Sequence, residues 1–149
     1  MKGKRVLMIC LVAVTVLGII FLKDGSNKKS EAIYNDQGLP VLLYHSISNN
    51  KGSKLFMPVE KFRQQMQYLK DNGYVTLTAE ELLAFYKDNA PIPEKSVLIT
   101  LDDGYADNYT NGFPILKQFG FKATVFVITA AIDTDPKKLT SEQIKDMAA

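Results

Sequence analysis

The longest run of apolar residues lies near the start of the chain, at residues 6–22, and basic residues flank it on both sides. Seventeen residues in a helix cover roughly 25 Å, close to the ~30 Å hydrocarbon thickness of a bilayer. No small-x-small cleavage pattern follows Leu22. The pattern predicts a signal peptide or a signal anchor at residues 1–22, the uncleaved anchor being favoured, with membrane contact through residues 6–22.

Polar residues rich in Gly, Ser, Asn and Lys follow at 23–38 and predict a flexible linker. From residue 39 onward, short apolar runs alternate with amphipathic stretches. The apolar runs predict strands at 39–44, 74–77, 97–101 and 123–128, and all of these except 74–77 are expected to be buried. Residues 46–57 are expected to form a loop.

Helix signals fill the intervals between the predicted strands. Val59, Phe62, Met66 and Leu69 follow Pro58 at spacings of three and four, which is typical of an amphipathic helix. Two capping boxes, at 78–81 and 140–143, predict further helix starts, and a helical stretch ends at residue 119 before a glycine. The alternation of strands and helices predicts an α/β fold, either a parallel sheet or a barrel.

Composition and charge exclude several classes of protein. The 149 residues are 46% hydrophobic and 23% charged, which excludes wholesale disorder. A single Cys, Cys10, and a single His, His45, exclude an internal disulfide, a cysteine zinc cluster and a site with several histidines from this chain. Residues 1–30 carry six Lys and Arg against one Asp, and the remainder is acidic. A nucleic-acid partner is therefore not expected.

Two adjacent carboxylates are the main candidate for chemistry. Asp102, Asp103 and Gly104 directly follow the predicted buried strand 97–101. Active sites of parallel α/β folds lie at the carboxyl ends of the strands. One carboxylate could bind a cation while the other moves a proton. The local residues are equally compatible with a simple Asp-Gly turn.

The wider sequence resembles the polysaccharide deacetylase family, also known as the NodB homology domain or carbohydrate esterase family 4. The resemblance is carried by ITLDDGYADNY at 99–109 and by FPILKQFGFKATVF at 113–126. It extends upstream through PVLLYHSI at 40–47 and the stretch 62–74. Residues 39–149 are thus similar to the N-terminal part of such a domain, which implies a partial (β/α) barrel preceded by the N-terminal signal or transmembrane helix.

The resemblance implies roles for the aspartates. Asp102 would be the general base and Asp103 a ligand of a divalent metal: zinc, or cobalt or nickel. The reaction would hydrolyse N-acetyl groups on an N-acetylglucosamine polymer, either peptidoglycan or a chitin-like poly-N-acetylglucosamine. The domain would lie on the extracellular side of a bacterial cell membrane, or be secreted if the signal is cleaved.

The resemblance also predicts that this chain lacks part of the site. The family's His-x-x-x-His metal motif, an arginine, a groove motif and a late histidine come after the residues present here. His45 could approach the site from the first strand, although a structural histidine is the commoner case. We therefore expect a truncated, poorly active form that binds metal weakly or not at all.

The remaining candidate residues have ordinary structural interpretations beside the functional ones. Tyr105 and Tyr109 could stack on sugar rings or simply pack on the following helix. Asp107 and Asn108 are expected to cap that helix, and residues 133–135 to form a solvated turn. A non-catalytic, membrane-anchored glycan-binding protein on a deacetylase scaffold is the alternative function. A magnesium-dependent phosphotransferase is disfavoured, because the residues after Asp102 lack the second spaced Asp and the Thr of such enzymes.

Overall fold

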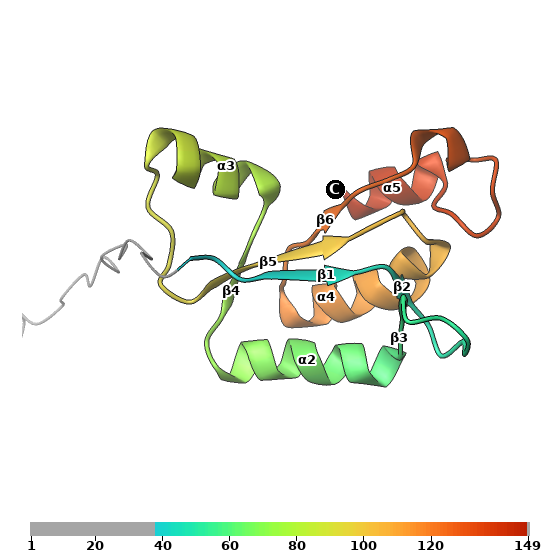
Figure 1. Ribbon diagram of the computed structural model, residues 1–149, viewed down its shortest axis with the longest axis horizontal. Coiled ribbons are helices and arrows are strands. Elements are labelled where there is room, and N and C mark those ends of the chain that lie inside the picture. Colours follow the sequence, from blue (N-terminus) through green and yellow to red (C-terminus); the bar gives the residue numbers. More distant parts are fainter. Residues whose placement is uncertain (1–37, 149) are drawn as a thin grey trace, which may run out of the picture. The chain divides into compact units, whose positions relative to one another are not determined.

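The computed structural model of the chain describes residues 38–148 (Figure 1). The predicted signal or anchor at residues 1–22 and almost all of the predicted linker at 23–38 lie outside the described residues. Within residues 38–148, no helix is both long and apolar enough to cross a bilayer.

The fold is built on a parallel sheet whose centre is β5, Ser96–Leu101. On one side β5 pairs with β1, Val41–Tyr44. On the other side β4, Val75–Leu77, pairs with the first half of β5, and β6, Thr124–Val125, pairs with its second half. All six residues of β5 are buried, as predicted for a parallel strand covered on both faces. The predicted α/β class with a parallel sheet is confirmed.

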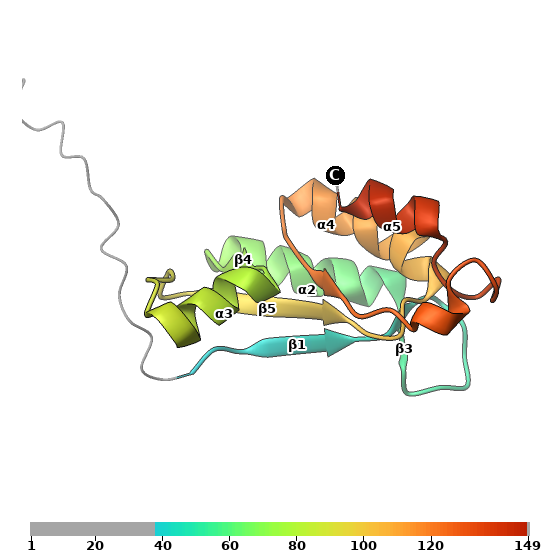
Figure 2. The ribbon, with the colours of Figure 1, turned by 90° about the horizontal axis from the view of Figure 1, so that it is seen from above.

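Two helices cover one face of this sheet: α2, Val59–Asp71, and α4, Phe113–Phe119 (Figure 2). The three-and-four spacing predicted for α2 is confirmed, because its buried side chains fall on one stripe. Tyr44 of β1 meets one of them, Phe62, edge to face at 4.9 Å between ring centroids. Burying side chains of this size stabilises the fold by roughly 1.5–3 kcal/mol each. The core comprises Tyr44, Ile47, Phe62, Met66, Leu69, Val97, Ile99, Leu101, Ile115, Leu116 and Phe119.

Both predicted capping boxes are confirmed. Helix α3, Ala79–Asp88, is capped by Thr78, and α5, Ser141–Met147, is capped by Thr140. Each threonine hydroxyl accepts a hydrogen bond from the amide three residues on, and each threonine's own amide donates to the side chain of that residue. Neither helix contains a buried residue, and Leu83 and Tyr86 of α3 are exposed. The starts of these two helices are therefore set by their capping hydrogen bonds, and burial of side chains contributes less to them than to α2 and α4.

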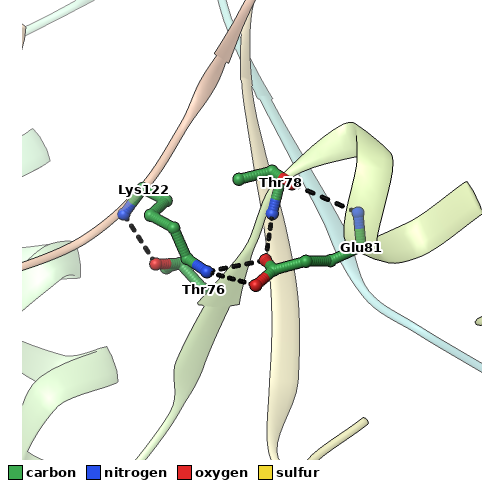
Figure 3. A network of polar contacts seen from close by, with 4 residues as sticks. All are labelled: Thr76, Thr78, Glu81 and Lys122. Atoms are coloured by element: carbon green, nitrogen blue, oxygen red, sulfur yellow. Dashed lines mark hydrogen bonds and ion pairs between the residues drawn. The ribbon is translucent and has the colours of Figure 1, made fainter. Parts of the chain in front are cut away.

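A polar network joins β4 to the segment that leads into β6 (Figure 3). The buried Thr76 hydroxyl accepts a hydrogen bond of 2.7 Å from the Lys122 amide, at the point where β4 ends and β6 begins along β5. The Lys122 ammonium lies 2.6 Å from the Glu81 carboxylate, which also accepts from the Thr78 amide. Lys122 and, to a smaller degree, Thr78 hold the pKa of Glu81 below its ordinary value.

Three expectations about strands are wrong. The predicted buried strand at 39–44 is β1, in which Val41 and Leu43 are exposed because only the alternate side chains, Leu42 and Tyr44, face the core. The predicted loop at 46–57 contains a second, two-stranded parallel sheet of β2, Ser46–Ile47, and β3, Phe56–Met57. Two-residue strands are too short to leave a periodic signal in sequence. The predicted buried strand at 123–128 is only the two residues of β6, both half-buried, while Phe126 and Ile128 are exposed. Apolar residues alone did not reveal that β6 pairs only with the last part of β5.

We predict that Thr76→Val and Lys122→Met destabilise the fold with different pH dependences. Thr76→Val leaves the Lys122 amide without its acceptor and should lower the free energy of unfolding by about 1–3 kcal/mol at every pH. Lys122→Met removes the partner of Glu81. A lowered folded-state pKa contributes stability that is present above the unfolded value of 4.5 and is lost as the pH falls through the folded pKa.

Urea unfolding of the two variants and the parent chain between pH 3 and pH 7 tests this. The Lys122→Met curve should converge with the parent curve on the acid side, whereas the Thr76→Val curve should stay parallel to it. Parallel curves for both variants would contradict the role given to Glu81.

Candidate active site

The sharp turn at the carboxyl end of β5 is built by the two aspartates and Gly104. The Asp102 amide donates to the Tyr44 carbonyl at 2.8 Å, so the β1–β5 ladder continues one residue past the strand. Asp103 and Gly104 then take left-handed backbone conformations, with φ of 67° and 57°. Asp tolerates this conformation better than most residues and glycine has no side chain to clash, which explains the local sequence.

Gly104 is also required by its surroundings. A Cβ atom at this position would lie 3.1 Å from Val127 Cγ1, in a backbone conformation that is already strained for other residues. Its carbonyl accepts a hydrogen bond of 2.9 Å from the Leu139 amide. The aspartate turn is therefore held between the segment that follows β6 and the segment that precedes α5.

Asp102 carries an unpaired oxygen. Its Oδ1 is buried, and no donor among residues 38–148 lies within hydrogen-bonding distance. The buried hydroxyl of Thr100, two residues earlier on β5, is unpaired in the same way. Buried polar atoms without partners are rare in folded proteins and cost stability. Two buried oxygen atoms at the carboxyl end of β5 therefore have no hydrogen-bond partner among the described residues.

Side chains that follow the aspartate turn hold the segment that follows β1. Asp107 accepts from the Ser46 hydroxyl at 2.6 Å and from the Ile47 amide at 2.9 Å. Asn108, fully buried, donates to the His45 carbonyl at 2.7 Å. The prediction that Asp107 caps its own helix is wrong, because it makes no capping bond there. Its partners lie some 60 positions earlier in the chain, which local sequence could not reveal.

We call the hydrogen bonds from this segment to residues 45–47 the polar clamp. They continue into a π-helical turn, η1, Asn108–Gly112. Asn111 donates to the Ile47 carbonyl at 2.8 Å. A Cβ atom on Gly112 would lie only 2.7 Å from Ile47 Cδ1, so a larger residue here would require the buried Ile47 side chain to shift. The insertion of a π turn into a helix is frequent near functional sites. Asp107, Asn108 and Asn111 together make four hydrogen bonds to residues 45–47.

His45 lies between the Tyr44–Asp102 backbone hydrogen bond and the contacts of the polar clamp. The residue before it accepts from the Asp102 amide, and its own carbonyl accepts from Asn108. Since Tyr44 is registered with Leu101, the backbone of His45 lies beside that of Asp102. The structure therefore brings His45 and the aspartate turn to the same end of the sheet. The neighbouring Tyr44 hydroxyl donates to Gln65, and burial raises the pKa of Tyr44 to about 12.

The two tyrosines after the turn already have partners in the fold. The Lys138 ammonium lies 3.6 Å from the centroid of the Tyr105 ring, and the two residues also form an isolated antiparallel bridge. Tyr109 stacks on Phe113 at 5.9 Å and donates to Asp146, which raises the pKa of Tyr109. The packing interpretation therefore describes Tyr109, which stacks on Phe113 of the following helix α4, whereas the contacts given for Tyr105 are with Lys138, before α5.

The predicted turn at residues 133–135 is confirmed. Asp133 has a left-handed backbone and accepts from the Ser141 amide at 2.9 Å, which lowers the pKa of its carboxyl group. Asp135 accepts from the Lys137 amide. Both carboxylates thus order the loop that leads into α5.

The metal implied by the family resemblance can be tested against the donors present. Among residues 38–148, no group of three His, Cys, Asp or Glu side chains could hold a metal ion. The aspartate turn offers carboxylate oxygens, but catalytic zinc takes three protein ligands. The described residues therefore do not by themselves fit this metal.

Comparisons with known proteins agree with the fold. Residues 89–149 match the sequence profile of the family described as Polysaccharide deacetylase. YxkH of Bacillus subtilis (strain 168), named as a polysaccharide deacetylase, is 47% identical over 110 residues, which are 74% of this chain and 38% of YxkH. The poly-beta-1,6-N-acetyl-D-glucosamine N-deacetylase of Escherichia coli (strain K12) is 29% identical over 78% of this chain and 18% of its own length.

Solved structures give the same result. Streptococcus pyogenes deacetylase PplD in complex with acetate superposes with a TM-score of 0.69 at 34% identity, over 74% of this chain and 51% of PplD. IcaB from Ammonifex degensii has a TM-score of 0.65 at 32% identity, over 74% of this chain and 48% of IcaB. The architecture is that of a deacetylase-type α/β fold, and the chain belongs to the polysaccharide deacetylase family. It spans less than two fifths of YxkH and about half of PplD and IcaB.

We predict that Asp107→Ala lowers the free energy of unfolding by about 1–3 kcal/mol, because it leaves the buried Ser46 hydroxyl and the Ile47 amide without their acceptor. Asp135→Ala is the matched control, since its carboxylate accepts one amide within an exposed turn, and it should change stability by about 0.5 kcal/mol or less. Urea unfolding at pH 7 measures both. Equal losses of unfolding free energy in the two variants would contradict the role given to Asp107.

Proposed function

We propose that this chain provides the general-base carboxylate of a polysaccharide N-deacetylase. The reaction is hydrolysis of the amide C–N bond of N-acetyl groups on an N-acetylglucosamine polymer, which releases acetate. The observation that carries the proposal is the buried, unpaired Oδ1 of Asp102 at the carboxyl end of the central parallel strand. Functional sites are where a fold tolerates such an unsatisfied group.

Asp102 has the position that proton transfer requires. A general base needs an oxygen that no internal donor occupies, within reach of the attacking water. Its backbone is fixed by the bond to the Tyr44 carbonyl, so the carboxylate is held on a rigid element. In this proposal Asp102 takes the proton from the water that attacks the acetyl carbonyl.

Asp103 is proposed to contribute one carboxylate oxygen to the family's divalent metal, zinc or else cobalt or nickel. Adjacent residues direct their side chains apart, so the two aspartates can serve different partners. Residues 38–148 do not supply the other ligands, and we therefore propose that this chain alone is poorly active. The sheet itself is proposed to be part of the (β/α) barrel of a larger domain.

The substrate class comes from the relatives. Proteins similar to this chain in Escherichia coli and Staphylococcus aureus are named poly-beta-1,6-N-acetyl-D-glucosamine N-deacetylases. We propose a β-linked N-acetylglucosamine polymer for this chain as well, with peptidoglycan as the other candidate. Anchoring through residues 6–22 would place the domain on the extracellular side of a bacterial membrane, next to such polymers.

A non-catalytic glycan-binding role is the second candidate. The observation that favours it is the absence of a three-ligand metal site among the described residues. A protein of this kind would retain the fold and bind glycans without turnover.

We predict acetate release from N-acetylglucosamine oligomers at a rate at least about tenfold below that of a full-length family member, a barrier difference of ~1.4 kcal/mol or more. Asp102→Asn should abolish the residual rate, because the amide cannot accept the proton, whereas Asp135→Asn should not change it. An enzyme-coupled acetate assay with added zinc or cobalt measures this.

Two outcomes would contradict parts of this proposal. Turnover near that of the full-length enzyme would show that the chain is not poorly active. Retention on chitin or peptidoglycan that survives Asp102→Asn together with Asp103→Asn, without any acetate, would favour the binding protein.

We predict that zinc binds this chain with a dissociation constant weaker than about 1 μM, equivalent to −8 kcal/mol. Asp103 offers one oxygen, and too few further ligands lie nearby to complete tetrahedral coordination. Titration calorimetry on the chain measures the constant. Tighter one-to-one binding would show that a complete site forms, and its loss in His45→Ala would identify His45 as the unexpected ligand.

A further inference from the structure

The dipeptide Asn-Gly occurs at two places in the chain, 72–73 and 111–112. An asparagine in this position can lose ammonia spontaneously, because the backbone nitrogen of the next residue attacks its side-chain carbonyl carbon. Glycine has no side chain that would hinder the attack, and its backbone adopts conformations that other residues avoid. The two copies have different surroundings, so the tertiary structure decides which of them reacts.

The first copy lies in the exposed turn at residues 72–74, which we call the α2 corner because it ends that helix. Asn72 is the C-cap of α2, and Gly73 follows it with a left-handed φ of 72°; both residues are exposed. A Cβ atom on Gly73 would have no neighbour within 4 Å. The Asn72 side chain donates to the Tyr68 carbonyl, and the Gly73 amide donates to the Lys70 carbonyl. Both partners belong to the last turn of the same helix, which frays at little cost in free energy.

The second copy is enclosed by the fold. Gly112 is buried at the end of η1, where a Cβ atom would lie 2.7 Å from Ile47 Cδ1. The Asn111 side chain donates to the Ile47 carbonyl at 2.8 Å, across 64 positions of sequence. The Ile47 side chain is itself fully buried. For Asn111 to react, the polar clamp and the π turn would have to open together, which costs more free energy than fraying of a helix end.

We propose that Asn72 is a site of spontaneous deamidation in the folded protein and that the polar clamp protects Asn111 from the same reaction. A bond forms between the Gly73 nitrogen and Asn72 Cγ, the bond from Cγ to Nδ2 breaks, and ammonia leaves with the proton that the Gly73 nitrogen loses. Water then opens the cyclic imide at either carbonyl, which gives aspartate or isoaspartate at position 72. Water is the one co-reactant, and the inference does not rest on the proposed function.

The two products differ in what they do to the α2 corner. Aspartate places a carboxylate beside the last carbonyls of α2, where the helix dipole disfavours negative charge, although the Lys95 ammonium lies 2.9 Å from the main-chain oxygen of residue 72. Isoaspartate instead adds a methylene to the main chain. The corner is closed by the bond from Gly73 to Lys70 and by one of 2.9 Å from the Tyr74 amide to the Leu69 carbonyl. A longer main chain cannot keep both bonds in this geometry, so isoaspartate should destabilise the fold more than aspartate does.

The candidate active site is remote from this change. Val75, directly after the α2 corner, is registered with Ser96 at the start of β5, whereas Asp102 follows the carboxyl end of that strand (Figure 1). Deamidation at residue 72 is therefore expected to change the stability of the chain and to leave the aspartate turn in place.

Peptide mapping by mass spectrometry measures both rates in the same molecules. The full chain is incubated at mildly alkaline pH, once folded and once in urea, and the gain in mass at each asparagine is followed over time. In the folded chain Asn72 should react at least about tenfold faster than Asn111, whereas the two rates should be similar in urea. Equal rates in the folded chain, or a faster reaction at Asn111, would overturn the inference. So would a folded chain in which Asn72 reacts more than about tenfold slower than it does in urea, because the corner would then be protected.

Two variants separate the modification from its consequence. Asn72→Gln keeps an amide at this position but would have to form a larger, less favourable ring, so the reaction at residue 72 should fall at least about tenfold while Asn111 is unaffected. Asn72→Asp reproduces the aspartate product without the added methylene. Urea unfolding after incubation should show a less stable population in the parent chain that is absent from Asn72→Gln and less stable than Asn72→Asp. The same population in incubated Asn72→Gln would overturn the assignment of this loss of stability to residue 72.

Discussion

The rest of the described structure depends on the hydrogen bonding and burial of β5. This strand pairs with β1 on one side and with β4 and β6 in succession on the other, and none of its six residues is exposed. Its odd-numbered residues pack against α2 and α4, and its carboxyl end continues directly into the aspartate turn. Core, sheet order and candidate site therefore share one element, and a change within β5 would affect all three.

The carboxyl end of β5 combines a rigid backbone with unused polar atoms. The turn is fixed from three directions, by the Tyr44 carbonyl, the close approach of Val127 and the Leu139 amide. Within that frame the Asp102 Oδ1 has no partner among the described residues. Such a combination costs folding free energy but leaves an acceptor in a fixed position, which is what proton transfer requires.

The polar clamp solves a related structural problem. The segment after β1 bends away from the main sheet to form β2, so its backbone groups lose the neighbours that a straight strand would have. Asp107, Asn108 and Asn111 replace those neighbours with side-chain hydrogen bonds. The clamp joins the ends of β1 and β5 and holds His45 beside the aspartate turn.

The sequence by itself determined the features that local physical chemistry controls. The periodic apolar positions predicted α2, the capping boxes predicted the starts of α3 and α5, and the run that is apolar apart from Thr100 predicted the buried strand before the aspartates. Each of these signals acts within a few residues, through helix periodicity, capping or burial. The resemblance of 99–126 to deacetylases added the family, which the comparisons bear out.

Only the tertiary structure decided the features that join distant segments. The pairing of β6 with just the end of β5, the short β2–β3 sheet and the contacts of Asp107 with Ser46 and Ile47 depend on chain segments that meet only after folding. An aspartate before a helix has the same local sequence whether it caps that helix or bonds to a strand 60 residues away. The unpaired oxygen of Asp102 likewise follows from which donors surround it in space, and sequence spacing carries no record of that.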